Sequence, residues 1–163
     1  MIRDVQLEDA GAICEIYNPY IEHTVISFEE ETVSTEEMIS RIQQVKSADL
    51  PWLVCVEDEK LMGYAYASRW KTREAYRFTA ESTIYLADSA QGRGIGKKLY
   101  EALFDQLRMQ GYHAVIGVIA LPNDASVALH ERMGFEKAAH FKEVGLKFGK
   151  WIDVGYWELL FDV

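Results

Sequence analysis

The sequence contains few cysteines and prolines and has no long apolar run. Its 163 residues include two cysteines and three prolines, and no low-complexity stretch or repeat marks a linker. Cys14 and Cys55 are too few for a disulfide framework, which favours a reduced, cytoplasmic protein. No run approaches the ~20 apolar residues of a membrane span, and the acidic start at Asp4, Glu8 and Asp9 does not resemble a signal peptide.

The chain also lacks an excess of positive charge. Its 17 Lys and Arg residues against 26 Asp and Glu residues give a formal charge of −9. This balance disfavours nucleic acid as a partner and, more mildly, an anionic membrane surface. The spacing of His23, His113 and His140 is not that of metal ligands, so no metal is expected. A length of 163 residues with 49% apolar content predicts a single domain over 1–163.

Apolar periodicity alternates between strand-like and helical segments. Strands are expected at 2–5, 52–56, 61–68, 82–86, 114–121, 135–140 and 153–161. One helix is expected at 10–17, and a second begins at the S-x-x-E capping box of residues 34–37. A third is expected from the glycine loop to Gly111, and a fourth from Pro122 to Gly134. The wholly apolar strand 114–121 is typical of a strand covered on both faces. This order predicts an α/β protein with a mixed sheet and helices on both faces.

The most informative motif is the loop Gln91-Gly92-Arg93-Gly94-Ile95-Gly96-Lys97-Lys98, which joins strand 82–86 to an amphipathic helix. Glycines at alternate positions permit positive φ and bring backbone N–H groups close to an anion at the positive end of a helix. A plain glycine turn is the alternative, but the order strand, loop, helix favours a phosphate site. The spacing fails both the dinucleotide fingerprint and the nucleoside triphosphate loop. The remaining pattern, Q-x-x-G-x-G, resembles the pyrophosphate-binding loop of the GNAT superfamily of acyl-CoA-dependent N-acyltransferases.

A second motif reads N-x-x-S-x-x-x-H-x-x-x-G-F over residues 123–135. Taken singly, Asn123 is a helix N-cap and Gly134 a helix stop. Taken together, the residues resemble the GNAT helix that lies beside the pantetheine of acyl-CoA and presents a proton donor to the departing thiolate. Many superfamily members have tyrosine where this chain has His130.

A narrower resemblance covers nearly the whole chain. Residues 16–28, 70–85, 121–130 and 144–157 are similar to the phosphinothricin and methionine sulfoximine acetyltransferases, in which histidine at position 130 is usual. This resemblance implies the GNAT fold, with about seven mostly antiparallel strands. It also implies a homodimer that transfers acetyl from acetyl-CoA to the α-amino group of a small glutamate-like amino acid.

The resemblance implies roles for particular residues. Glu81 is the general base, although its unperturbed pKa near ~4.3 must be raised, for instance by burial against Trp70, Tyr76 or Phe78. His130 protonates the thiolate, holds a water or orders the helix. The acetyl-CoA contacts are Ile84, Tyr85, Leu86, Gln91, Gly92, Arg93, Gly94, Ile95, Gly96, Lys97, Lys98, Asn123 and Ser126, and the substrate contacts are Phe28, Arg73, Tyr76, Arg77 and Thr79.

The acceptor is less constrained by the sequence than the reaction. Lys71, Arg73 and Arg77 form a local basic cluster that suits a carboxylate or phosphinate, or is simply a solvated loop. Phe28, Tyr76 and Trp151 are candidate walls of a substrate pocket. Two other functions remain open, namely an acetyltransferase for another amine, such as a peptide N-terminus or a polyamine, and an acyl-CoA-binding module without turnover.

Overall fold

The computed structural model describes residues 1–162, which form seven strands, four α-helices and three short 3₁₀ turns. The strands are β1 (Ile2–Asp4), β2 (Trp52–Glu57), β3 (Lys60–Arg69), β4 (Thr79–Leu86), β5 (Ala114–Leu121), β6 (Glu136–Lys147) and β7 (Lys150–Leu160); the helices are α1 (Ala10–His23), α2 (Thr35–Ser47), α3 (Ile95–Met109) and α4 (Asp124–Arg132); the 3₁₀ turns are Leu7–Asp9, Glu74–Tyr76 and Asp88–Ala90.

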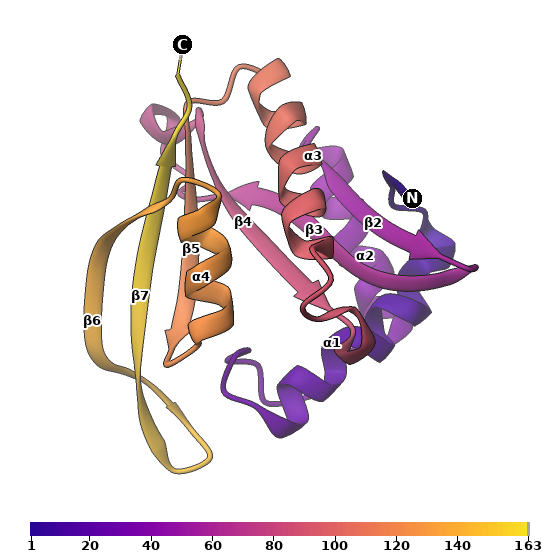
Figure 1. Cartoon of the computed structure of the whole chain (residues 1–163), viewed down its shortest axis with the longest axis horizontal. Coiled ribbons are helices and arrows are strands. Elements are labelled where there is room, and N and C mark those ends of the chain that lie inside the picture. Colours follow the sequence, from indigo (N-terminus) through magenta and orange to yellow (C-terminus); the bar gives the residue numbers. More distant parts are fainter. Residues whose placement is uncertain (163) are drawn as a thin grey trace.

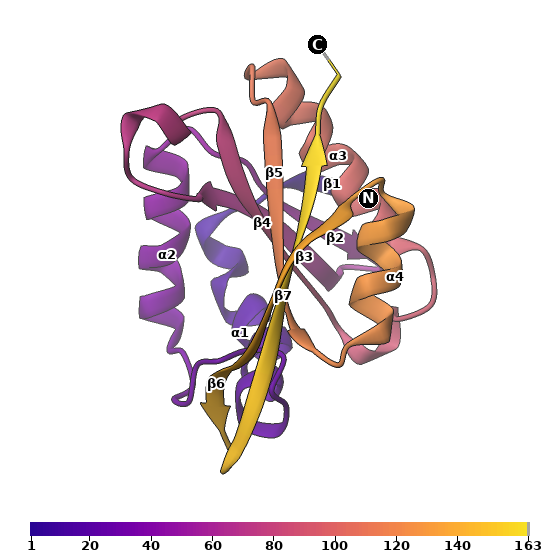
Figure 2. The same ribbon diagram turned by 90° about the vertical axis from the view of Figure 1, so that its left-hand side faces the viewer.

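All seven strands belong to one sheet in the order β1-β2-β3-β4-β5-β7-β6. Only the central pair, β4 and β5, is parallel among the described strand pairs, and the others are antiparallel. Helices lie on both faces, with α1 and α2 on one side and α3 and α4 on the other (Figure 1; Figure 2). The predicted mixed, mostly antiparallel sheet with two helical layers is therefore confirmed.

The sheet divides the apolar core into two clusters, one under each helical layer. Helix α3 contributes the predicted stripe, since Leu99, Leu103 and Leu107 are fully buried. The helix ends as expected before Gly111, whose φ of +86° is accessible to glycine at little cost. The capping box is also confirmed at its first residue, because the Ser34 side chain accepts a hydrogen bond from the backbone N–H of Glu37.

Several predicted boundaries are wrong. Strand β4 begins at Thr79 rather than at residue 82, so Glu81 lies within the strand. Helix α1 continues past residue 17 to His23, because Pro19 interrupts one hydrogen bond without ending a helix that packs against the sheet. The last two strands are longer than predicted and meet in a tight hairpin, with positive φ at Phe148 (53°) and Gly149 (71°). These dihedral signs match the two-residue turns that suit the twist of a hairpin.

Candidate functional site

The parallel strands β4 and β5 separate part-way along their length. They pair only from Thr79 with Ala114 to Ser82 with Gly117. Beyond this point β4 continues to Leu86 and β5 to Leu121, and Figure 1 shows the two strands diverging toward their carboxyl ends. The edge of β4 that faces β5 is thus left without a strand partner over residues 83–86. Apart from the Leu86 carbonyl, which accepts a hydrogen bond from the Tyr20 hydroxyl, this edge can offer its backbone groups to a ligand.

A cavity of about 500 Å³ occupies this gap. Residues from both helical layers line it, among them Tyr17 of α1 and Tyr100 of α3, so the cavity reaches from one face of the sheet to the other. Its lining residues are Tyr17, Ile26, Ser27, Phe28, Glu29, Tyr66, Glu81, Ser82, Thr83, Ile84, Tyr85, Tyr100, Val118, Ile119, Ala120, Asn123, Ser126, His130 and Val154.

Glu81 and Ser82 mark the point where the strands separate. Neighbouring residues of a strand face opposite sides of the sheet, so Glu81 lies on the α1 and α2 side and Ser82 on the α3 and α4 side. Burial raises the pKa of Glu81, and the charge of Lys71 opposes that rise. The Ser82 hydroxyl is buried on the other face, beside the Tyr100 side chain, and this contact opposes the rise that burial causes in the pKa of Tyr100. A carboxylate and a buried hydroxyl therefore flank the same gap from opposite faces.

His130 lies on the Ser82 side and is buried, at 3% exposure. Its Nδ1 is 2.7 Å from the carbonyl oxygen of Ser126, and because a carbonyl only accepts, Nδ1 carries the hydrogen. Nε2 is then the acceptor for the Tyr100 hydroxyl at 3.2 Å. Burial lowers the pKa of His130, and the Ser126 carbonyl opposes this shift. The imidazole is therefore neutral near pH 7, with both nitrogens engaged.

Glycine at position 117 makes room for this histidine. A Cβ built on Gly117 would lie 2.7 Å from Cδ2 and 2.8 Å from Nε2 of His130. Phe135 packs edge-on against the imidazole at a centroid distance of 4.9 Å. The histidine is thus fixed by packing as well as by hydrogen bonds.

The glycine loop follows β4 and leads into α3. Gly94 is the N-cap of this helix with φ 77° and ψ 7°, and no side chain caps the helix there. The N–H groups of the first helical turn lack intrahelical partners, and the helix dipole makes this end positive. At the start of the loop, Gln91 donates to the Tyr20 hydroxyl, which donates to the Leu86 carbonyl at 2.5 Å. The loop end therefore suits an anionic group next to the cavity.

One expectation for this loop is wrong. Gly92 and Gly94 have positive φ, but Gly96 lies inside α3 with an ordinary helical backbone. Its lack of a side chain has a different role, because a Cβ there would lie 3.2 Å from Leu129 of α4. Gly96 therefore permits close packing of α3 against α4.

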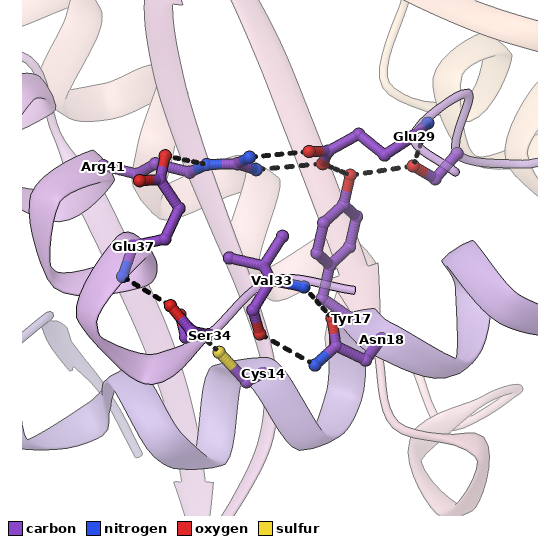
Figure 3. A network of polar contacts seen from close by, with 9 residues as sticks. Cys14, Tyr17, Asn18, Glu29, Val33, Ser34, Glu37 and Arg41 are labelled. Carbon is purple, nitrogen blue, oxygen red and sulfur yellow. Dashed lines mark hydrogen bonds and ion pairs between the residues drawn. The ribbon is translucent and has the colours of Figure 1, made fainter. Parts of the chain in front are cut away.

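A polar network holds the loop of residues 24–34, which connects α1 to α2 and forms one wall of the cavity (Figure 3). Arg41 binds both carboxylate oxygens of Glu29, at 2.9 and 2.6 Å. The Tyr17 hydroxyl donates to the same carboxylate and is 2.8 Å from the Ser27 hydroxyl. Hydrogen bonding to Arg41 lowers the pKa of Glu29. Asn18 bonds both backbone groups of Val33, so α1 holds the loop at two places.

The structure brings seven of the twenty predicted catalytic, acetyl-CoA and substrate residues together at the cavity and leaves the other thirteen outside it. Glu81, His130, Phe28, Ile84, Tyr85, Asn123 and Ser126 line it, whereas Leu86, the glycine loop, Thr79, Arg73, Tyr76, Arg77 and Trp151 do not. The basic cluster lies on the exposed connection between β3 and β4, where Arg77 donates to the Glu74 carbonyl and stacks on Phe78. Arg93 pairs with Glu57 at 2.7 Å. These side chains face solvent in the single chain.

Sequence reasoning missed several residues of the cavity. Tyr100 belongs to an apolar helical stripe, and its hydroxyl was the only polar signal on that face. Ser82 had the signal of adjacency to Glu81. Tyr17 and Glu29 lie far from both motifs in sequence, and the fold alone brings them to the cavity.

Within residues 1–162 no group of three or more His, Cys, Asp or Glu side chains is arranged to hold a metal ion. The helices there are all too short or too polar to cross a membrane.

Comparison with known proteins identifies relatives over nearly the full length. Residues 2–155 match the model of the acetyltransferase (GNAT) domain family. The phosphinothricin N-acetyltransferase of Streptomyces viridochromogenes is 38% identical over 99% of this chain and 88% of its own length. The L-methionine sulfoximine/L-methionine sulfone acetyltransferase of Salmonella typhimurium is 34% identical over 99% of this chain and 94% of its own.

Solved structures agree with the sequence relatives. A putative acetyltransferase from Salmonella typhimurium, determined with its cofactor acetyl-CoA, superimposes with a TM-score of 0.96. It shares 34% identity, and the match covers 100% of this chain and 94% of the other.

Proposed function

This chain belongs to the GNAT acetyltransferase family, and from that premise we propose that it acetylates the α-amino group of a small glutamate-like amino acid. Membership of the family makes it an acetyl-CoA-dependent N-acetyltransferase. Its relatives include enzymes named for phosphinothricin and for methionine sulfoximine and sulfone. The observation that carries the proposal is the cavity through the sheet, with Glu81 on one face and the His130 cluster on the other.

The residues at the gap suit acetyl-CoA in this arrangement. The uncapped start of α3 at Gly94 would receive the pyrophosphate through backbone N–H groups. The unpaired edge of β4 over residues 83–86, together with Asn123 and Ser126 of the α4 start, would hold the pantetheine. Acetyl-CoA supplies the activated acyl group. The chain's own contribution is to bind it in the gap and to present an amine from the Glu81 side.

Glu81 is proposed to take the proton of the acceptor ammonium, directly or through water. A free α-amino group titrates near ~8, so forming the neutral amine at pH 7 costs about 1.4 kcal/mol. A carboxylate whose pKa burial has raised is sufficient for this transfer. Of the possible roles of His130, we favour the ordering of its neighbours. The neutral ring donates to the Ser126 carbonyl and accepts from the Tyr100 hydroxyl. It would thereby hold the Tyr100 hydroxyl on the face of the gap where the thioester sulfur of acetyl-CoA would lie.

The basic cluster supports an anionic acceptor. Lys71, Arg73 and Arg77 lie on the connection that leads into β4 just before Glu81, and the charge of Lys71 acts on that carboxylate. A carboxylate or phosphinate bound there would place its amine close to Glu81. A polyamine, which is cationic, would be repelled by the same residues.

We also propose that the chain acts as a cytoplasmic homodimer, as one domain over 1–163, without nucleic acid or membrane. The exposed apolar residues of the β6–β7 hairpin favour a second copy of the chain as the partner, because a patch of this kind is normally covered. They are Phe141, Val144, Leu146, Phe148 and Trp151, at 49–64% exposure. Sedimentation equilibrium should give twice the mass of the chain; a monomer at micromolar concentration contradicts the dimer.

The acceptor is tested by thiol release from acetyl-CoA. Phosphinothricin, methionine sulfoximine and methionine sulfone should give higher kcat/KM values than spermidine or a short peptide. Mass spectrometry of the product should place the acetyl group on the α-nitrogen. Faster turnover of the peptide or the polyamine would favour the other acetyltransferase hypothesis.

A further inference from the structure

Lys147 of β6 is a buried lysine, at 2% exposure, that is not among the predicted site residues. Its Nζ donates to the backbone oxygen of Ile21 at 2.8 Å and to that of Ser27 at 2.6 Å. Nζ also lies 5.0 Å from the centroid of the Phe148 ring. A buried ammonium is costly unless it is hydrogen-bonded. Burial lowers the pKa of Lys147, while the charges of Glu30 and Glu29 oppose that shift.

The two carbonyls that Lys147 holds belong to neighbouring parts of the chain. Ile21 is in the last turn of α1, where carbonyls lack intrahelical partners and the helix dipole favours a cation. Ser27 belongs to the 24–34 loop, and its side chain lines the cavity. One ammonium therefore joins the end of α1 to the loop that follows it. Figure 2 shows this part of the chain beside the turn end of the β6–β7 hairpin.

Gly145 provides a second contact between β6 and the same loop. Residues 145 and 147 face the same side of the strand, and both are buried, unlike their exposed neighbours. A Cβ on Gly145 would lie 2.5 Å from two atoms of the Phe28 ring. The ring therefore rests directly on the glycine backbone. Phe28, like Ser27, lines the cavity.

The loop is thus held from two sides. On the helical side, Arg41 and Tyr17 bind Glu29, as Figure 3 shows. On the sheet side, Lys147 and Gly145 hold the two adjacent positions that carry Ser27 and Phe28. This wall is on the same side of the sheet as Glu81, the side assigned to the acceptor.

We propose that Lys147 is a positioning residue, which, with Gly145 as the seat of the Phe28 ring, fixes the acceptor-facing wall of the cavity. The choice of acceptor rests on the proposed function. Lys147 acts on acceptor affinity through Ser27 and Phe28, and leaves acetyl-CoA binding at the α3 end unchanged.

Hydrogen exchange tests the positioning without any substrate. Lys147→Met keeps an unbranched side chain that is only one atom shorter and removes the ammonium. Lys150→Met is the matched control, because Lys150 is exposed and pairs with Lys147 across the hairpin. Backbone amides of Ile26 and Glu29, which are bonded within the loop, should exchange at least about tenfold faster in Lys147→Met. Unchanged exchange in this variant, or equal acceleration in Lys150→Met, overturns the proposal.

Kinetics tests the consequence for the reaction. Lys147→Met should raise KM for the amino-acid acceptor about tenfold or more, with the acetyl-CoA Kd from calorimetry within about twofold of wild type. Lys147→Arg, which keeps the charge, should recover part of the acceptor affinity. Faster loop exchange with unchanged acceptor KM contradicts the role in acceptor binding. If wild type acetylates no amino acid, the proposed function fails, while the exchange measurement still decides whether Lys147 holds the loop.

A second pair of variants covers the case in which Lys147→Met does not fold. Gly145→Ala should raise acceptor KM by displacing the Phe28 ring. In a Phe28→Leu background, which removes the ring, the same alanine should have little further effect, giving a clear coupling in the double-mutant cycle. Additive effects of the two substitutions overturn the proposed seat.

Discussion

Gly94→Val separates the binding role of the glycine loop from its role in folding. Gly94 has φ 77° and ψ 7° at the N-cap of α3, and a Cβ there meets no heavy atom within 4 Å. The Cβ of the new residue therefore has room, and the main cost is the strain of a β-branched residue in the left-handed region. That strain is about 1–3 kcal/mol, against a total stability of about 5–15 kcal/mol for a typical domain. The fold should therefore survive.

The effect on binding should be larger than the effect on stability. Relief of the strain reorients the first N–H groups of α3, and the new side chain stands over them. Loss of two charge-assisted hydrogen bonds to a phosphate, at about 1.5–3 kcal/mol each, corresponds to a rise in acetyl-CoA Kd of about 10²–10⁴-fold.

Calorimetry with acetyl-CoA and thermal unfolding measure the two effects separately. Gly111→Val is the matched control, because Gly111 lies just past the other end of α3 with φ 86° and equally open surroundings. Both variants should lose similar stability, and only Gly94→Val should lose affinity. Wild-type affinity in folded Gly94→Val, or an equal loss in Gly111→Val, would refute the reasoning.

Two further predictions concern the acceptor and the histidine. Arg73→Ala should raise KM for amino-acid acceptors by about 10–150-fold, the range of one charge-assisted hydrogen bond, and steady-state kinetics with an unchanged KM would reject this contact. His130→Phe should reduce the single-turnover rate by less than about tenfold, because the imidazole is neutral and its nitrogens are hydrogen-bonded to Ser126 and Tyr100. A loss above about 10²-fold in a folded variant would indicate that His130 donates a proton.

The parts of the fold set by local pattern were predictable from the sequence. The Leu99, Leu103 and Leu107 stripe, the cap at Ser34 and the stop at Gly111 follow from short-range periodicity and backbone preference. The extension of α1 through Pro19 was not predictable locally, because tertiary packing compensates for the missing hydrogen bond. The length of the last hairpin was underestimated because the usual pattern of burial is inverted in the second half of β6, where the apolar Val144 and Leu146 are exposed while Gly145 and Lys147 are buried.

The candidate site also contains a part that local sequence predicts and a part that tertiary contacts determine. Glu81 and His130 lie in segments that the sequence singles out, and both line the cavity. The wall built from Ser27, Phe28 and Glu29 depends on contacts over long sequence separations, such as that from Lys147 to Ser27. The point at which β4 separates from β5 could not be predicted from the sequence of either strand, because it depends on how the two strands pair.

The central claim is that Glu81 receives the proton of the amine at the gap between β4 and β5. The most direct test is single-turnover acetylation of methionine sulfone by wild type and Glu81→Gln as a function of pH. Because burial raises the pKa of Glu81, the wild-type rate should fall as pH drops through that pKa, and the glutamine variant should lack this limb. The account predicts a loss of about 10²–10⁴-fold with acetyl-CoA affinity preserved. A loss under about threefold throughout pH 6 to 9 would contradict it.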